Sequence, residues 1–498
     1  MRRYCVQLLA LVVLLGMSAA ASELRVAVAT EPPGLDPTTD ATAVIRQLLH
    51  HNLYEGLVQV NEDGELHPQL AESWQVSNDG LTYRFELREG VTFHDGTPLD
   101  AEVVAHTFRR AMDPETGHRR REEYEIIERI NVVDELTVEF YLAEPRPAFL
   151  PLLALAQSVI VPLEADGLAQ HPIGTGPFEF VEWRPADRLV LERNHAYYVP
   201  ERPLLDRVEF HFIRDPASQR RSLLAGEVEL VIEPTPEIAL GIRDKPGFAV
   251  ISAPSPLLQV LSINNSRPPF DELAVRQAIA HAVDRQQIID LVFYGDGTPI
   301  GSHLTPRPPY SAFYEDVTGL YPHDPSTART LLADAGYADG FSLTLTLPSN
   351  YAHHVRTGEV IADQLEEVGI DVRIELVDWG TWLERVYSQG EYDLTVIAHP
   401  GRLDPALMLG VYGPERPDYY FRRGWESEEL NELLETGAVE LDQERRQDIY
   451  ARAQEILAQD VVNVYLQDMH AMIGIRDGVR GVSIYPIYAL DLSQVSVE

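Results

Sequence analysis

Cysteine is almost absent from this chain of 498 residues: Cys5 is the only one, and it lies near the start of a segment that we expect to be removed. Without a second thiol the chain can form no intramolecular disulfide and no thiolate metal site, and without Cys5 it has no cysteine nucleophile. Cys5 also lies far from the end of that segment, where a lipid would be attached. These absences exclude thiol chemistry and point away from a lipid anchor.

Lysine is almost absent as well. Lys245 is the only lysine among 40 basic residues, which face 78 acidic ones, so the formal net charge is −38. A chain this acidic repels phosphate backbones, so we expect no nucleic-acid partner. The acids are scattered along the chain, which is typical of a solvated surface. Adaptation to a saline compartment and the drift of an arginine-rich genome would both produce this composition.

Beyond the amino terminus the chain has no apolar run long enough to cross a bilayer. The amino terminus itself has the pattern of a secretory signal: Arg2 and Arg3, then an apolar stretch over 6–17, then small residues at 18–21. This pattern predicts a signal peptide over residues 1–21 that is cleaved at its carboxyl end. We therefore expect an exported, periplasmic protein.

Motifs that mark catalysis are missing. The sequence has no G-x-S-x-G, no P-loop, no H-E-x-x-H and no G-x-G-x-x-G that opens a helix, and paired acids carry little information in so acidic a chain. His353 and His354 are adjacent, so on a helix they do not face one metal ion. We predict no catalytic residue, no metal and no cofactor. An exported hydrolase is the alternative from another functional class.

Hydrophobic periodicity predicts a mixed α/β chain, and its length suggests two or three domains. In the first half, alternation predicts strands over 24–29, 83–87, 132–142, 189–192 and 208–213, and a helix capped by Asp100. In the second half, helices alternate with strands, which favours a largely parallel sheet. The elements expected there are a long helix after Asp271, a helix from Pro325 to Gly336, strands over 343–347, 372–376 and 394–398, and a helix over 360–368.

Ordered sequence blocks resemble one known family. The longest block contains Leu70-Ala71-Glu72-Ser73-Trp74, Asp79-Gly80, Tyr83, Phe85, Leu87-Arg88, Gly90-Val91, Phe93-His94-Asp95-Gly96 and Pro98. Later blocks are Pro172-Ile173-Gly174-Thr175-Gly176-Pro177-Phe178, Asn194 with Tyr197, Pro203 with Asp206, residues 221–227, Arg276-Gln277-Ala278-Ile279 with Asp284-Arg285, Gly369-Ile370 and Tyr392-Asp393-Leu394. Together, over roughly 24–481, they resemble the extracellular solute-binding proteins of the peptide and nickel uptake family.

The resemblance implies an α/β fold of two lobes, the Venus-flytrap fold of periplasmic binding proteins, joined by two hinge strands. We expect the first lobe at residues 22–263 plus 481–498, with an additional subdomain at about 50–170. The second lobe is expected at 264–480. Lobe closure around a ligand is a hinge motion, and the permease reads the closed state.

The resemblance also implies a function without catalysis: capture of a small polar ligand, such as a peptide or peptide-like acid, for delivery to an ABC permease in the inner membrane. A metal chelate, an opine or an oligosaccharide on the same scaffold is the alternative ligand. The net charge and the resemblance favour a monomer.

Candidate ligand residues follow from the resemblance, because ligand groups in this family gather where the lobes face each other, beyond the carboxyl ends of strands. The substrate-binding candidates are Thr30, Glu31, Trp379, His399, Gly401, Arg402 and Asp404. Five of them have a structural alternative. Trp379 and Glu31 could serve packing, His399 could be a satisfied loop histidine, Arg402 and Asp404 could form a local ion pair, and Asp404 could cap a turn.

The loop over 399–404 departs from the peptide-binding relatives, whose loop carries an acidic residue that pairs with the peptide's amino terminus. By its spacing to the following proline, that acid falls here on Gly401, and Asp404 does not match it residue for residue. Arg402 places a cation where those relatives have none, which suits a ligand with a carboxylate or phosphate.

Salt should stabilise the protein if its surface is adapted to a saline compartment, because screening weakens the repulsion among the excess acids. We expect the melting temperature of residues 22–498 to rise between about 10 mM and about 500 mM NaCl, a range over which screening becomes strong. Differential scanning calorimetry at several salt concentrations measures this directly. A melting temperature that stays flat across the series would contradict the saline interpretation.

Overall fold

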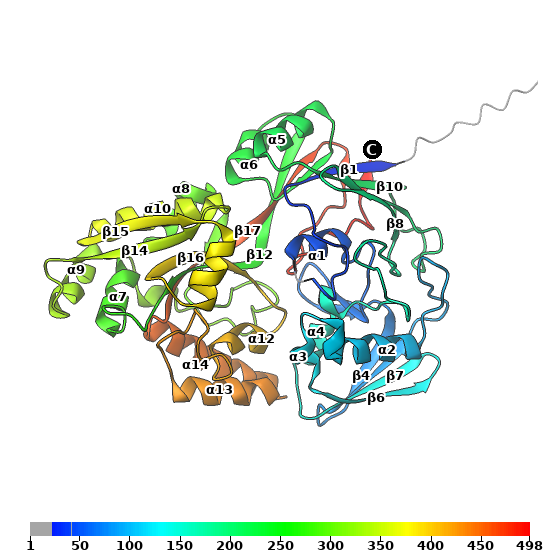
Figure 1. The fold of residues 1–498 in the computed structure, drawn as a ribbon, viewed down its shortest axis with the longest axis horizontal. Helices are drawn as coiled ribbons and strands as arrows, with labels where there is room; N and C mark the ends of the chain where they lie inside the picture. The colour runs from blue at the N-terminus through cyan, green and yellow to red at the C-terminus, as the bar shows by residue number, and fades with distance from the viewer. Residues whose placement is uncertain (1–21, 41) are drawn as a thin grey trace, which may run out of the picture.

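The computed structural model describes residues 22–498 except residue 41, and leaves out the side chains of residues 255 and 256. The predicted signal peptide, residues 1–21, lies outside the described residues. Figure 1 shows two lobes side by side, one built mainly from the first half of the chain and the carboxyl terminus, the other from the second half. No helix within the described part has the length and apolar composition to span a membrane.

One sheet of 11 strands runs through both lobes. Its main path is β15 (Ile370–Val377), β14 (Phe341–Pro348), β16 (Leu394–Pro400), β12 (Phe248–Ile263), β17 (Asn463–Arg476), β11 (Leu230–Ile232), β1 (Glu23–Val28), β10 (Arg207–Phe212), β9 (Arg188–Arg193) and β8 (Phe178–Arg184). β13 (Gly297–Pro299) pairs with β17 off this path. The sheet is mixed: β1 is parallel to β10 and β11, and β14 is parallel to β15 and β16.

The long strands β12 and β17 connect the two lobes and pair antiparallel along their length. Residues 257–263 of β12 pair with β16 of the second lobe, whereas residues 473–475 of β17 pair with β11 of the first. Between them the register shifts, from Pro254 to Leu258. We propose that the lobes divide at this shift, inside the strands, which differs by several residues from the division at 263/264 and 480/481 expected above.

The second lobe has helices on both faces of its sheet. Alternation along β12 directs Leu261 and Ile263 to one apolar core and Leu258 and Val260 to the other. The first core is covered by α7 (Leu273–Ala282), α8 (Arg285–Phe293), α9 (Pro325–Asp334) and α10 (Ala352–Glu366). The second is covered by α11 (Trp379–Trp382), α12 (Pro405–Leu409), α13 (Glu428–Val439) and α14 (Gln443–Gln459).

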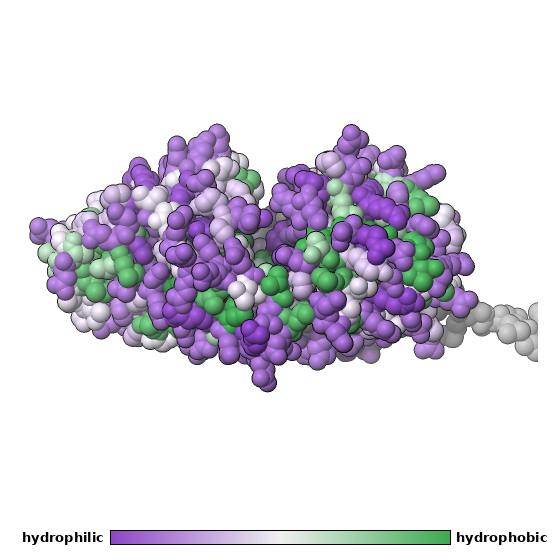
Figure 2. All heavy atoms as spheres, turned by 90° about the horizontal axis from the view of Figure 1, so that it is seen from below, coloured by the Kyte–Doolittle hydropathy of each residue, from purple (hydrophilic) through white to green (hydrophobic). Residues whose placement is uncertain are grey.

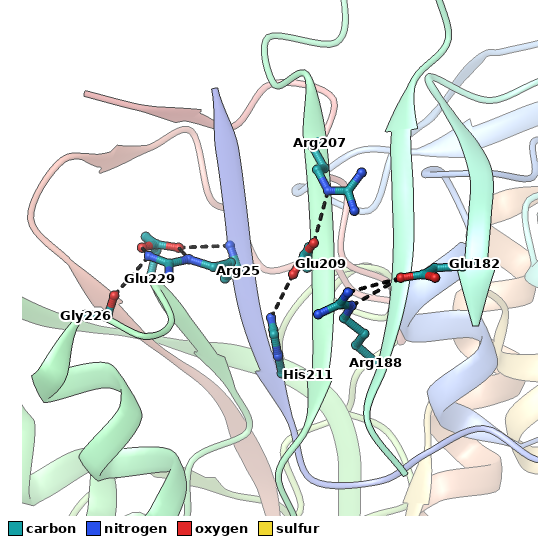
Figure 3. A network of polar contacts seen from close by, with 8 residues as sticks. All are labelled: Arg25, Glu182, Arg188, Arg207, Glu209, His211, Gly226 and Glu229. Carbon is teal, nitrogen blue, oxygen red and sulfur yellow. Dashed lines mark hydrogen bonds and ion pairs between the residues drawn. The ribbon is translucent and has the colours of Figure 1, made fainter. Parts of the chain in front are cut away.

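The first lobe packs α1 (Ala43–Leu49) and the carboxyl-terminal segment, which includes β18 (Val479–Arg480) and β19 (Ser496–Val497), against one face of the sheet. On the other face, α5 (Pro216–Ala225) and α6 (Pro236–Arg243) cover only part of the sheet. Where that face is open, charged side chains pair along β10 and between β8 and β9, as Figure 3 shows. The contacts include Arg207 Nε to Glu209 Oε1 at 3.0 Å, His211 Nε2 to Glu209 Oε2 at 3.2 Å and Arg188 Nη2 to Glu182 Oε1 at 3.2 Å.

A subdomain with its own apolar core extends the first lobe. Its sheet has the order β4 (Ala71–Val76), β5 (Thr82–Leu87), β7 (Thr137–Leu142), β6 (Ile127–Asp134), and β2 (Val58–Val60) pairs with β3 (Leu66–Pro68) beside it. Its helices are α2 (Ala101–Met112), α3 (Arg121–Tyr124) and α4 (Phe149–Leu153). Asp100 caps α2 by accepting a hydrogen bond from Val103 N at 2.9 Å, as its sequence predicts.

Two elements differ from the sequence expectation. The single strand expected over 132–142 is the hairpin of β6 and β7, because the chain turns at Asp134, whose carboxylate accepts a hydrogen bond from Leu136 N. The long helix expected after Asp271 is two helices, α7 and α8. Asp284 separates them by capping α8 at Gln287 N, so the apolar periodicity continues through a break in the backbone.

A buried ion pair ties the start of α12 to α14. The carboxylate of Asp404 accepts hydrogen bonds from Arg446 Nη1 at 3.0 Å and Nη2 at 2.6 Å, and both side chains are 6% exposed. Asp404 Oδ1 also accepts a hydrogen bond from Ala406 N at 2.8 Å, so the same carboxylate caps α12. The Arg446 guanidinium donates further to Gly437 O and lies over the ring of Phe313.

A second buried acid lies in a hinge strand. Asp468 of β17 is fully buried opposite Leu258, at the register shift, and neither of its carboxylate oxygens has a hydrogen-bond partner. Burial raises the pKa of this carboxyl to about 8, because the charged form loses hydration, and the opposing effects of the Leu257 N–H, the Thr305 hydroxyl and Arg307 do not outweigh that loss. Asp468 is therefore protonated at neutral pH and is a point of pH sensitivity between the lobes.

Removing Asp404 should unfold the second lobe more easily, because it leaves the Arg446 guanidinium buried without a counter-charge. We expect Asp404→Ala to lower the free energy of unfolding by about 3–5 kcal/mol in urea denaturation. Arg452→Ala on the same helix is the matched control: its pairs with Glu429 and Glu455 are exposed, so its loss should stay below about 1 kcal/mol. Equal effects of the two variants would show that the Asp404 pair has no special role.

Stability should fall as pH rises because of Asp468. Its folded pKa of about 8 exceeds the unfolded value, so the unfolded chain releases this proton first and is favoured increasingly until pH passes about 8. The contribution is about 1 kcal/mol per pH unit between pH 5 and pH 8. Asp468→Asn should remove this slope and stabilise the protein at pH 8, as measured by urea denaturation across pH. A slope that is unchanged in the variant would contradict the assignment.

Candidate ligand-binding site

Arg402 connects the two lobes. It follows β16 in the second lobe, and its Nη1 lies 2.6 Å from Oε1 of Glu123 on α3 of the first-lobe subdomain. The two side chains are each 19% exposed, so the ion pair is largely shielded from solvent. The backbone N–H of Arg402 donates to the hydroxyl of buried Tyr310, which holds the loop in place. The Arg402 guanidinium therefore lies where the lobes meet, a seam visible in Figure 2 with a notch between the lobes.

Two more arginines lie beside this pair. Arg120, immediately before α3, donates to the same Glu123 oxygen at 2.9 Å. Arg46 of α1 has an Nε that is buried without a hydrogen-bond partner. Burial, and then the positive charges of Arg120 and Arg402, lower the pKa of Arg46 to about 10. Burial and the charge of Arg402 likewise lower the pKa of Arg120. These shifts show that the three guanidinium groups are close enough to repel one another.

The charge of this cluster is not balanced by the protein. Burial alone would raise the pKa of the Glu123 carboxyl, but Arg402 and Arg120 outweigh it and hold the pKa below its usual range. Glu123 is therefore ionised and supplies one negative charge against three guanidinium groups, and no ion pair among the described residues involves Arg46. We name Arg46, Arg120 and Arg402 the arginine cluster. It suits the binding of anions, and a guanidinium holds carboxylates without exchanging protons.

An acidic side chain marks a second part of the same region. Glu233 directly follows β11 and lines a cavity together with Gln47, Tyr488 and residues of β17. Glu233 is exposed at this cavity. Partial loss of hydration there raises the pKa of its carboxyl, against the opposing hydrogen bonds from Tyr488 and Gln47. Tyr488 of this cavity and Arg46 are close enough for each to affect the other's pKa, so the cavity and the arginine cluster are neighbours.

Aromatic side chains of the second lobe lie near Glu233 and Tyr488. Tyr351, at the start of α10, is close enough to Glu233 and Tyr488 for their charges to affect one another's pKa. Behind it lies Trp379, whose ring centroid is 5.4 Å from that of Tyr351 and which stacks on Trp382 at 5.0 Å. One turn further along α10, Arg356 pairs with Glu237 of the first lobe. The lobes thus contact each other on either side of the cavity.

The structure separates the residues proposed from the sequence. Arg402 and Gly401 lie at the seam between the lobes, and Trp379 lies one aromatic ring behind it. Thr30 is exposed after β1. The Glu31 carboxylate accepts hydrogen bonds from Trp183 Nε1 at 3.2 Å and Ala186 N at 3.0 Å, so it braces the turn between β8 and β9.

The remaining two candidates are held by their own lobe. Asp404 is in the buried pair with Arg446 described above. The His399 imidazole shares a hydrogen bond with the Tyr420 hydroxyl, and its ring centroid lies 4.0 Å from that of Phe421. Burial, with the nearby His303, keeps the pKa of His399 well below its ordinary value, so the ring is neutral. Their roles in ligand binding stay predictions, and both side chains have structural partners.

Several residues of the site were missed by reasoning from the sequence, namely Arg46, Arg120, Glu123, Glu233, Tyr351 and Tyr488. Each lies in an ordinary local pattern, and only the fold brings them together from α1, α3, β11, α10 and the carboxyl-terminal segment. Glu233 did carry one signal, since it comes directly after a short buried strand, where open α/β sheets place ligand groups. Within the described residues, no group of three or more histidine, cysteine or acidic side chains could hold a metal ion.

Comparison with known proteins places this geometry in a family. Residues 65–412 match the model of the bacterial extracellular solute-binding proteins, family 5. The glutathione-binding protein GsiB of Escherichia coli O1:K1 is 31% identical over 454 residues, which cover 89% of this chain and 88% of that protein. GsiB of Salmonella paratyphi A is 31% identical over 452 residues, covering 88% and 87%.

Solved structures of binding proteins have the same fold as this chain. The periplasmic binding protein AgaA of A. tumefaciens R10, in complex with agropinic acid, superposes with a TM-score of 0.81 at 29% identity, covering 96% of this chain and 99% of that one. DppA of Helicobacter pylori, in complex with the peptide STSA, superposes with a TM-score of 0.80 at 26% identity, covering 96% of this chain and 99% of that one. NikA of Brucella suis, in complex with Fe(III)-EDTA, superposes with a TM-score of 0.87 at 25% identity, covering 96% of this chain and 100% of that one.

These relatives are binding proteins with two lobes, so the family and the fold expected from the sequence are confirmed. The alignments also extend over most of this chain and over most of each relative. The chain therefore belongs to the bacterial extracellular solute-binding proteins of family 5, and it serves an ABC importer as the component that captures a small polar solute and delivers it to the permease.

Proposed function

We propose that the solute is a peptide or peptide-like acid whose carboxylate groups bind the arginine cluster between the lobes. One observation carries this proposal: Arg402 and Arg120 share the single carboxylate of Glu123 and Arg46 lies near both arginines, which leaves the region with unbalanced positive charge. A ligand carboxylate would satisfy the buried, unpartnered Nε of Arg46 and relieve the repulsion that lowers its pKa.

The names of the relatives support an acidic ligand. Glutathione carries two carboxylates, agropinic acid is an acid, and EDTA is a polycarboxylate that wraps a metal ion. An opine or a metal chelate would therefore also suit the arginine cluster, whereas an uncharged oligosaccharide would leave its charge unsatisfied. We therefore propose acids ahead of sugars.

The proposal includes a role without catalysis. The charged and aromatic side chains gathered between the lobes are arginines, tyrosines and glutamates, and the candidate histidine, His399, is neutral and bonded within its own lobe. The protein would work as a monomer that is exported by cleavage of residues 1–21 without a lipid anchor. A scan of ester, peptide and glycoside substrates tests the hydrolase alternative, and turnover above background would overturn the binding role.

Loss of Arg402 should weaken binding of acidic solutes. A charge-assisted hydrogen bond contributes about 1.5–3 kcal/mol, so we expect Arg402→Ala to lower affinity by about 10- to 100-fold in isothermal titration. The panel would contain glutathione, di- to hexapeptides, agropinic acid, metal chelates and neutral oligosaccharides, screened first by thermal shift, since ligands that bind the folded state raise the melting temperature.

Arg356→Ala is the matched control. It also removes one ion pair between the lobes, with Glu237, but lies outside the arginine cluster, so its effect should stay within about threefold. Equal losses in the two variants would mean that Arg402 acts only by holding the lobes together. If no acid binds while a neutral sugar does, the proposal is overturned. Native mass spectrometry of the purified protein shows whether a copurified solute occupies the site.

A further inference from the structure

Glu233 has a strained backbone at an open position. Its φ is 51°, in the left-handed region that residues other than glycine rarely occupy, and its N–H donates to Met472 O of β17 at 3.0 Å. The strain turns the chain out of β11 at the cavity instead of continuing along the sheet. Strained residues of this kind gather at ligand sites, where the surrounding structure holds a side chain in a required direction.

The Glu233 carboxylate has neutral hydrogen-bond partners and no cation. The Tyr488 hydroxyl donates to its Oε1, and the Gln47 amide lies close enough to lower its pKa. No ion pair among the described residues includes Glu233, although its neighbour on α6, Glu237, has Arg356. A carboxylate that is held at a cavity by neutral partners alone is free to form a charge-assisted hydrogen bond with a cationic group of a bound ligand.

The surroundings suit an ammonium group. Two tyrosine side chains, Tyr488 of the first lobe and Tyr351 of the second, lie beside Glu233, and their rings and hydroxyl groups can both interact with a small cation. Tyr488 also lies near Arg46, whose charge acts on its pKa. The cavity at Glu233 and the arginine cluster therefore lie near each other, with Tyr488 between them, and carry opposite charges.

We propose that Glu233 binds the amino group of the solute while the arginine cluster binds its carboxylates, so that the solute is a zwitterion with a free amino group. This inference rests on the proposed function and narrows it, because it selects peptides and amino-acid derivatives over acids without an amine. It also places the amine-binding acid in the first lobe after β11. In the second lobe, where the peptide-binding relatives carry theirs, this chain has Gly401 and Arg402.

The test compares matched ligands with free and blocked amines. Glutathione, Met-Leu and Ser-Thr-Ser-Ala would each be titrated in parallel with the N-acetylated form, and agropinic acid and glutarate would serve as acids without a primary amine. The proteins are wild type, Glu233→Gln and the control Glu237→Gln, which makes the same charge change on α6. Glutamine keeps the shape and the bond to Tyr488, so folding should be preserved, which thermal melting checks.

We expect at least one free amine to bind the wild type about tenfold or more tightly than its acetylated form, and Glu233→Gln to lose this preference while binding the acetylated form as before. Glu237→Gln should keep it. The inference is overturned if acetylation or Glu233→Gln changes nothing, or if agropinic acid or glutarate binds while every free amine fails. In the last case the proposed acid-binding function survives. If no acid in the panel binds, both the proposed function and this inference are overturned.

Discussion

The antiparallel pairing of β12 with β17 is the constraint on which the rest of the molecule depends. Both strands belong to both lobes, so the sheet is continuous from β15 at one edge to β8 at the other. Their pairing fixes which loops face each other across the seam, with β16 delivering Arg402 and β11 delivering Glu233. The register shift at Pro254 and Leu258 interrupts the ladder where bending would occur, and the neutral Asp468 lies at that point.

Charge in this protein is distributed for two purposes. On the open face of the first-lobe sheet, arginines and glutamates form balanced, partly buried pairs (Figure 3). Between the lobes the charges are not paired one to one. Arg46, Arg120 and Arg402 outnumber the carboxylate of Glu123, and the carboxylate of Glu233 has no ion-pair partner among the described residues. A chain with a net charge of −38 thus concentrates positive charge in the one region where an acid would bind.

Much of the fold could be predicted from the sequence, because its signals are local. Asp100 and Asp324 cap the helices that their positions indicate, and the family blocks identified the two-lobe architecture. The break between α7 and α8 was not predicted, because the apolar spacing continues through it. Only the cap at Asp284 marks the end of one helix and the start of the next. Periodicity reports which side chains are buried, and it does not report whether the backbone between them is continuous.

The site was predictable only where one loop carried it. Arg402 could be singled out because it places a cation in a family loop where the peptide-binding relatives have none. Arg46 and Arg120 are ordinary arginines near helix ends, and only tertiary contacts bring them to the site. Asp404, adjacent in sequence, has a different partner because its side chain points into the second lobe toward Arg446.

The division of the arginine cluster between the lobes has a consequence for release. Guanidinium groups keep their charge at any pH that the protein meets, so proton transfer cannot discharge the solute. Opening the hinge, however, would carry Arg402 away from Arg46 and Arg120 and divide the proposed binding site between the lobes. Mechanical work done on the lobes by the permease would then lower affinity directly, and the solute would leave because its site no longer exists as one surface.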